Sequence, residues 1–150
     1  MSVLDTSTLV EEERLWNELC DTIRSFDEEE ALTPGYFSEG WTAKDALAHI
    51  GTWLAEAGAA LEQIRGGSYV ELRSDQLDEL NARFLDAMRD VPLRDVMNQA
   101  AAARARMLHV WTELREPDEV AARWIRKSGS EHYLEHLPRL HEWLRELRVD

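Results

Sequence analysis

The chain has 150 residues, of which 44% are hydrophobic and 31% charged, and its formal net charge is −13 at pH 7. This length and composition predict one domain, residues 1–150, with a single sizeable core, and exclude a disordered chain. The excess of acidic residues excludes nucleic acid and anionic membrane surfaces as partners, and no apolar run approaches the roughly eighteen residues of a membrane span.

The N-terminal sequence does not resemble a signal peptide, and there is one cysteine, Cys20. An internal disulfide is therefore excluded, and we expect a cytoplasmic protein. The first helix is predicted from about Leu9 to about Leu32, because apolar residues recur there at three- and four-residue intervals. Cys20 lies on this apolar stripe, which favours a buried structural thiol over a nucleophile. The sequence TPGYFSEG that follows is predicted to be a loop.

The second helix is predicted to begin at Thr42, because Thr42 and Asp45 have the spacing of a capping box. Its apolar stripe runs as far as Gly66-Gly67. A shorter amphipathic helix is expected from about Asp75 until Pro92, which cannot continue a preceding helix.

A further long helix is predicted from Leu93 to Leu114, whereas residues 115–127 fit either a short helix or an irregular crossing. The last helix is predicted to start near Ser128, which forms a second capping-box pattern with Glu131. Together these segments predict an all-α fold, a four-helix bundle with an extra short helix between helices two and three.

The segment SEHYLEHLPRLHEW carries three of the five histidines of the chain. His132 and His136 are four residues apart, so on a helix they share one face. His49 lies beside the apolar stripe of the second helix, and the three rings are expected to meet at a groove of the bundle. The alternative, in which the spacing is a coincidence and the rings are structural, stays open at this point. His109 and His141 are expected to be structural or exposed.

Three imidazole nitrogens would hold a divalent metal and leave an open coordination position, as in catalytic zinc sites. His132 is expected in the first helical turn, where the helix dipole favours the neutral ring that a metal requires. Pro138 complicates this arrangement, because a helix that began there would separate His132 from His136. The Ser128 pattern favours a continuous, kinked helix.

Two stretches of the chain resemble the DinB-like superfamily of metal-binding four-helix bundles. GWTAKDALAHIGTWLAE resembles the opening of its second helix, and HYLEHLPRLHEWL resembles its C-terminal His-x-x-x-His. The order of the elements is also similar over nearly the whole chain. The resemblance implies a metal site at His49, His132 and His136, filled by zinc or alternatively by nickel, manganese or iron.

Members of that superfamily include S-transferases and isomerases that use low-molecular-weight thiols such as mycothiol or bacillithiol. The resemblance therefore implies transfer of a small thiol, as cosubstrate, to a small electrophile. Alternatives are hydrolysis of a strained small molecule, or a helical bundle that acts by binding alone. Six tryptophans and four apolar helices also leave surface for a homodimer.

Several other residues are candidates for roles around the site. Asp45 and Glu135 could orient a ligand histidine, although a capping or solvent-facing role is favoured for both. Three aromatic residues could line the pocket mouth, although aromatics at helical spacing are more often part of the core: Tyr133, Trp53 and Trp143. Five basic residues could bind an anionic ligand: Arg104, Arg106, Arg123, Arg126 and Lys127.

Overall fold

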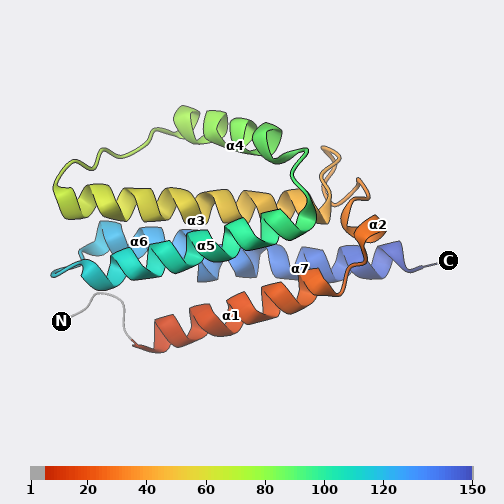
Figure 1. Cartoon of the computed structure of the whole chain (residues 1–150), viewed down its shortest axis with the longest axis horizontal. Coiled ribbons are helices and arrows are strands. Elements are labelled where there is room, and N and C mark those ends of the chain that lie inside the picture. The colour runs from red at the N-terminus through yellow and green to blue at the C-terminus, as the bar shows by residue number, and fades with distance from the viewer. Residues whose placement is uncertain (1–5, 150) are drawn as a thin grey trace.

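The computed structural model describes residues 6–149, which form seven helices and contain no strand. The helices are α1 (Thr6–Arg24), α2 (Glu28–Ala31), α3 (Ala43–Gly66), α4 (Ser74–Met88), α5 (Leu93–Glu113), α6 (Glu119–Ser128) and α7 (Ser130–Leu147). The long helices α1, α3, α5 and α7 form a bundle, and α4 lies on the outside of α3 (Figure 1). The predicted all-α fold is confirmed, as is the short helix between the second and third long helices.

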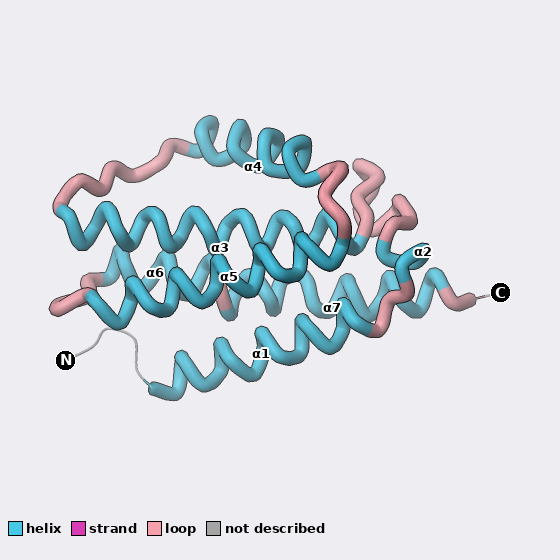
Figure 2. Tube along the Cα trace, viewed as in Figure 1, coloured by secondary structure: helices cyan, strands magenta, loops and turns pink. Residues whose placement is uncertain are grey.

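The first predicted helix is too long, because α1 ends at Arg24 and a separate short helix follows. The break has a local cause in Asp27, whose side chain accepts a hydrogen bond from the Glu30 N–H at 2.7 Å. The Glu30 carboxylate in turn accepts from the Asp27 N–H at 3.0 Å. This capping box starts α2 and leaves residues 25–27 as a turn (Figure 2).

The predicted start of the second helix is confirmed, since Thr42 and Asp45 form the capping box at the N-terminus of α3. Buried Lys44 then ties this end of α3 to the turn before α5. Its ammonium donates to the carbonyls of Arg89 at 2.7 Å and Val91 at 2.8 Å. Further along, Gly51 allows close packing on α5, because a Cβ at Gly51 would lie 3.0 Å from the Ala100 side chain.

The junction between α6 and α7 differs from the sequence-based expectation. Ser128 is the last residue of α6, and Gly129 separates the two helices, so Ser128 does not cap α7. A side chain at Gly129 would place its Cβ 2.6 Å from the Ile125 carbonyl oxygen. The segment 115–127, which the sequence left ambiguous, contains all of α6 except its last residue, Ser128. The continuous helix through Pro138 is confirmed, because α7 includes that residue.

A buried ion pair joins three of the long helices. Glu12 on α1 is 2% exposed and receives two hydrogen bonds from Arg104 on α5, at 2.6 and 2.8 Å. The hydroxyl of Tyr133 on α7 donates a third, at 2.9 Å. Arg104 also lies over the ring of Trp16, 5.4 Å from its centroid. This carboxylate is therefore buried with a full set of partners, which is the condition for keeping a charge in a core.

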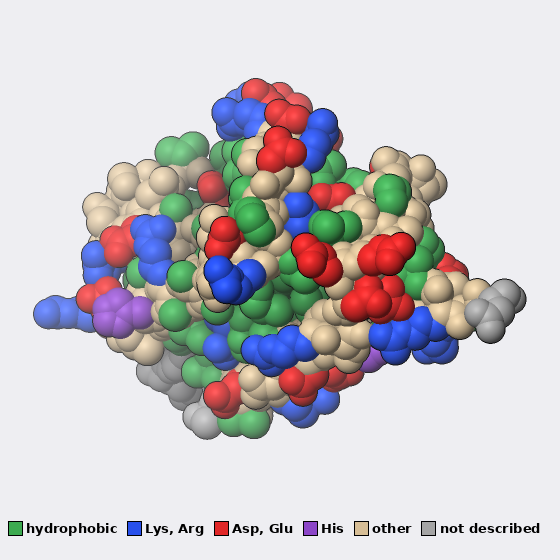
Figure 3. Space-filling model, turned by 45° about the vertical axis from the view of Figure 1, so that its right-hand side comes forward, with side chains coloured by type: hydrophobic (Ala, Val, Ile, Leu, Met, Phe, Trp, Pro, Cys, Tyr) green, Lys and Arg blue, Asp and Glu red, His purple; other side chains and the backbone are tan. Residues whose placement is uncertain are grey.

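The helix α4 packs on the bundle only lightly. Its apolar face turns toward α3, yet none of the described side chains of α4 is buried. Acidic and basic side chains cover the top of the molecule, where α4 lies, and hydrophobic side chains are visible below them (Figure 3). No helix formed by residues 6–149 is both long and apolar enough to cross a membrane.

Candidate metal site

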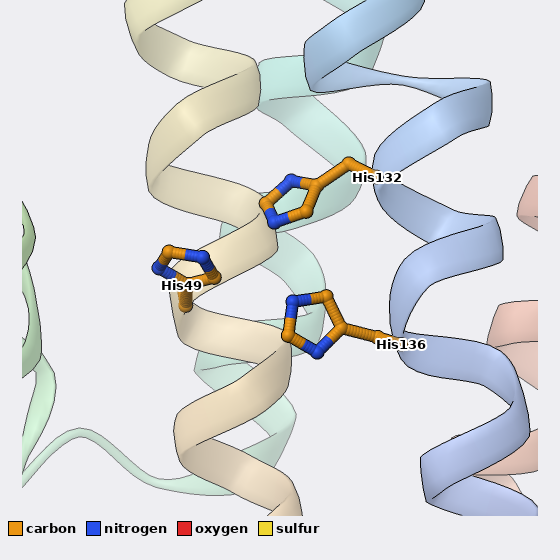
Figure 4. A group of neighbouring side chains, drawn as sticks. All are labelled: His49, His132 and His136. Carbon is orange, nitrogen blue, oxygen red and sulfur yellow. The ribbon is translucent and has the colours of Figure 1, made fainter.

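The three histidines expected to meet do come together. His49 projects from α3, and His132 and His136 project from the first two turns of α7 (Figure 4). Their ring centroids are 4.8 Å apart for His49 and His132, 4.9 Å for His132 and His136, and 5.5 Å for His49 and His136. One nitrogen of each ring lies within 4.8 Å of the others. The rings point toward one another, as ligands to one ion would (Figure 4).

All three imidazoles are neutral at neutral pH. Burial lowers the pKa of His49 to about 4 and that of His136 to about 4, where the neighbouring His49 adds to the effect. Burial, followed by the proximity of His49 and His136, lowers the pKa of His132 to about 3. Desolvation thus does more here than the helix dipole invoked from the sequence. Neutral imidazole is the form that binds a metal, so the cluster does not need to lose protons first.

The Tyr36 hydroxyl favours one tautomer of the His136 ring. The Tyr36 hydroxyl lies 2.8 Å from Nδ1 of His136 and 3.5 Å from the carbonyl oxygen of the same residue. A hydroxyl that donates to the carbonyl can accept from Nδ1–H, which leaves Nε2 with its lone pair toward the other two rings. His132 has no such side-chain partner: its buried Nδ1 makes no hydrogen bond of good geometry to any residue from 6 to 149, and the contact with the Ser128 backbone is the smallest of the influences on its pKa.

The loop that carries Tyr36 closes one side of the cluster. Its backbone folds back on itself, since the N–H groups of Gly35 and Tyr36 both donate to the Trp41 carbonyl, at 3.0 and 2.8 Å. Trp41 packs edge-on against His49 at 5.3 Å, and Phe37 lies 6.0 Å from His136. These two partly buried rings cover the cluster on this side.

Arg139 fastens the loop to α7. Its guanidinium donates to the carbonyls of Tyr36 at 2.7 Å and Gly35 at 3.2 Å. Gly35 has a φ of 124°, and a Cβ there would lie 2.7 Å from the Trp143 ring, so this position requires glycine. The clamp holds the Tyr36 hydroxyl in place beside His136.

The other side of the cluster opens on a cavity of about 350 Å³. His49 and His132 line it, together with residues of α4, of α6 and of the segment between α3 and α4. The remaining lining residues are Trp53, Tyr69, Glu71, Leu72, Leu77, Asn81, Arg123, Trp124, Lys127, Ser128 and Glu135. The three rings therefore lie between a closed aromatic side and an open cavity, which is the arrangement of a site that receives a small ligand.

The structure places some of the candidate residues at the cavity and others elsewhere. Trp53, Arg123 and Lys127 line the cavity, as does exposed Glu135, for which a solvent-facing role was favoured. Tyr133 does not line it, because it is fully buried on a different face of α7, beside Glu12.

Four other candidates are also engaged elsewhere. Trp143 packs against Gly35 and Arg139. Arg104 pairs with Glu12, and Arg126 pairs with Glu119 and Glu131. Arg106 packs against Gly58 and is not part of the cavity wall.

The remaining candidates have the favoured structural roles. Asp45 caps α3. The two other histidines are exposed and lie near carboxylates, His109 beside Glu113 at 3.6 Å and His141 beside Glu18 at 3.5 Å. Tyr36 was not expected at the site. The sequence did hold one indication: Tyr36 and Phe37 are adjacent aromatic residues inside a glycine-containing loop. Large aromatic side chains are favoured by burial, so such a pair in a loop indicates that the loop packs against the protein.

Comparison with known proteins supports the fold and leaves the chemistry open. No protein-family model matches the chain, and no curated protein sequence matches it significantly. An uncharacterised protein from Escherichia coli UTI89, known from a crystal structure, is similar with a TM-score of 0.79. The similarity covers 95% of this chain and 93% of that one, at 13% sequence identity. At this identity the likeness is one of fold.

Proposed function

We propose that this chain is an enzyme of the DinB-like type that uses a divalent metal ion, with His49, His132 and His136 as the ligands. The observation that carries the proposal is the meeting of three neutral imidazoles, from two helices, two of which, His49 and His132, line a cavity. Nitrogen donors suit zinc, and nickel, manganese or iron are alternatives. Tyr36 would orient His136 from outside the ligand set.

The reaction we propose is transfer of a low-molecular-weight thiol to a small electrophile. A divalent ion held by the three histidines supplies Lewis acidity, which lowers the pKa of a thiol or a water bound beside it. The cavity admits a small molecule from the open side, while Phe37 and Trp41 cover the closed side. The thiol would lose its proton to water, and the thiolate would form a bond to a carbon of the electrophile while the bond from that carbon to a leaving group, such as bromide, breaks and its electron pair departs with the leaving group.

The metal content of protein purified without a histidine tag tests the site. We expect about one equivalent of metal in the wild type, and a loss of at least roughly a hundredfold in affinity for His49→Ala and for His136→Ala, each of which removes one ligand nitrogen. His109→Ala is the control, because His109 is exposed and far from the cluster in the fold. Wild-type protein that neither carries metal nor binds added zinc through these histidines would contradict the proposal.

Thiol consumption with a generic electrophile, such as monobromobimane, tests the reaction. We expect metal-loaded wild type to accelerate it and folded His49→Ala not to. Tight metal binding without acceleration for any small thiol would favour a hydrolase or a protein that acts by binding.

Tyr36→Phe tests the outer contact. Loss of the hydroxyl should weaken zinc binding by about ten- to hundredfold, because Nδ1 of His136 loses its partner. Tyr69→Phe is a matched control, since the Tyr69 hydroxyl accepts from Trp124 and does not contact a histidine of the cluster. Competition with a chelating dye measures both affinities. Equal weakening in the two variants would exclude a specific role for Tyr36.

A further inference from the structure

Two tryptophans form an aromatic wall next to the histidine cluster. Trp53 follows His49 by one turn of α3, and Trp124 lies one turn before Ser128 at the end of α6. Their ring centroids are 6.3 Å apart and the ring planes are inclined by 28°. Both side chains line the cavity. A ligand that reaches the histidines must therefore lie against these rings.

The polar atoms of the wall are already in use. Nε1 of Trp53 donates to the side-chain oxygen of Asn81, and Nε1 of Trp124 donates to the Tyr69 hydroxyl at 2.9 Å. Two further rings support the wall edge-on, Phe84 against Trp53 at 5.8 Å and Tyr69 against Trp124 at 6.4 Å. The tryptophans are thus held in place, and they offer a ligand ring surface and no free donor.

The charged side chains of the cavity balance one another. Arg123 pairs with Glu71 at 2.7 Å. Lys127 and Glu135, also on the cavity wall, have no ion-pair partner within the described part of the chain. The neutral histidines add no charge, so a divalent ion bound to them would keep its full charge. An anionic atom of a ligand is therefore favoured at that end of the cavity.

We propose that the cavity binds a small aromatic anion, with its ring against Trp53 and Trp124 and its thiolate or carboxylate toward the histidines. The anionic end rests on the proposed function, because it presumes the metal. The cavity of about 350 Å³ is near the lower limit of ligand pockets, which suits one ring on a short arm. One helical turn, about 5.4 Å, separates the levels of His49 and Trp53, which sets that arm at one or two atoms.

Two matched pairs of probes test the proposal by isothermal titration calorimetry on zinc-loaded and zinc-free protein. Phenylmethanethiol and cyclohexylmethanethiol have the same reach and differ in the flatness of the ring. Benzoate and cyclohexanecarboxylate make the same comparison without a thiol. We expect the flat ring to bind about three- to tenfold more tightly in at least one pair.

Substitutions at Trp124 test whether the preference for the flat ring arises from the tryptophan wall. Trp124→Leu should abolish it, whereas Trp124→Phe, which keeps a ring and loses the same hydrogen bond to Tyr69, should retain it. Circular dichroism establishes that both variants are folded. A preference in the benzoate pair with no binding of either thiol would support the aromatic site and contradict thiol transfer. Equal binding of both rings in both pairs, a preference that persists in Trp124→Leu, or no binding of any probe would overturn the proposal.

Discussion

Two buried polar clusters lie on different faces of the first turns of α7, and adjacent residues of the chain contribute to them. Tyr133 belongs to the cluster with Glu12 and Arg104, and His132 belongs to the cluster with His49 and His136. In the first cluster the buried carboxylate is matched by a guanidinium and a hydroxyl. In the second, three rings face one another without a counter-charge, and Nδ1 of His132 makes no hydrogen bond of good geometry to the described residues.

The two clusters differ in whether the fold itself supplies partners for the buried polar groups. Glu12 is satisfied by the fold itself, so it needs nothing further to remain buried. The histidines are buried at a cost that the folded chain alone does not recover, and an ion would supply what is missing. Polar groups left incomplete in a core are candidates for ligand binding, whereas complete ones are candidates for holding helices together.

Low pH should have the largest effect, because it destabilises the histidine cluster. The folded pKa values of His132 and His136, about 3 and about 4, lie below the ordinary value of 6.5, so the unfolded chain binds more protons between those limits. The stability of the metal-free protein is therefore complete above pH 6.5 and falls as the pH drops toward 4.

At pH 5 the loss should be about 2 kcal/mol for each of the two buried histidines, and less for half-buried His49. Urea unfolding between pH 7 and 5 measures this loss. His132→Leu should flatten the dependence, and an unchanged slope in that variant would contradict the assignment.

Removal of a partner from the complete cluster has the next largest effect. Arg104→Met leaves the Glu12 carboxylate buried and unpaired, which should lower the free energy of unfolding by about 3–5 kcal/mol. Arg14→Met is the matched control, because Arg14 makes a similar two-bonded pair with Glu11 on the exposed face of α1, at 2.6 and 2.9 Å.

That exposed pair should contribute less than about 1 kcal/mol. Chemical denaturation gives both values, and zinc affinity should stay unchanged in both variants. A loss of zinc binding in folded Arg104→Met would show that the two clusters are not independent.

The smallest expected effects come from the adjacent positions on α7. Tyr133→Phe removes a hydroxyl that donates to a buried carboxylate and should cost about 2 kcal/mol. His132→Leu in the metal-free protein at pH 7 should be neutral or stabilising, because it removes a buried polar atom that makes no hydrogen bond of good geometry. Thermal unfolding measures the change in stability of both variants. We expect a loss for Tyr133→Phe and no loss or a gain for His132→Leu, and equal losses would contradict the difference between the two clusters.

Features encoded within a few residues were predictable. The capping box of Thr42 and Asp45 is local, and the four-residue spacing of His132 and His136 needs only a helix. His49 was predicted to join them because it lies beside the apolar stripe of its own helix, and that stripe must face the same core. The prediction that Ser128 caps the last helix was wrong, because Ser128 is the last residue of α6 and Gly129 is the residue that precedes α7.

Contacts between distant residues were not predictable from a single sequence. Tyr36 and His136 are a hundred residues apart, and nothing local in either segment indicates the other. Tyr133 was a candidate for the pocket mouth, with a place in the core as the favoured alternative. The 100° rotation between successive residues of a helix takes it instead to Glu12.

The light packing of α4 has a consequence for how this protein could diversify. The segment from Tyr69 to Asn81 supplies much of the cavity wall, yet none of the described side chains of α4 is part of the buried core. Residues that select a ligand and residues that make the chain fold are therefore largely different ones. Exchange of this segment between related chains should change which molecules are accepted while the bundle and its three histidines remain as they are.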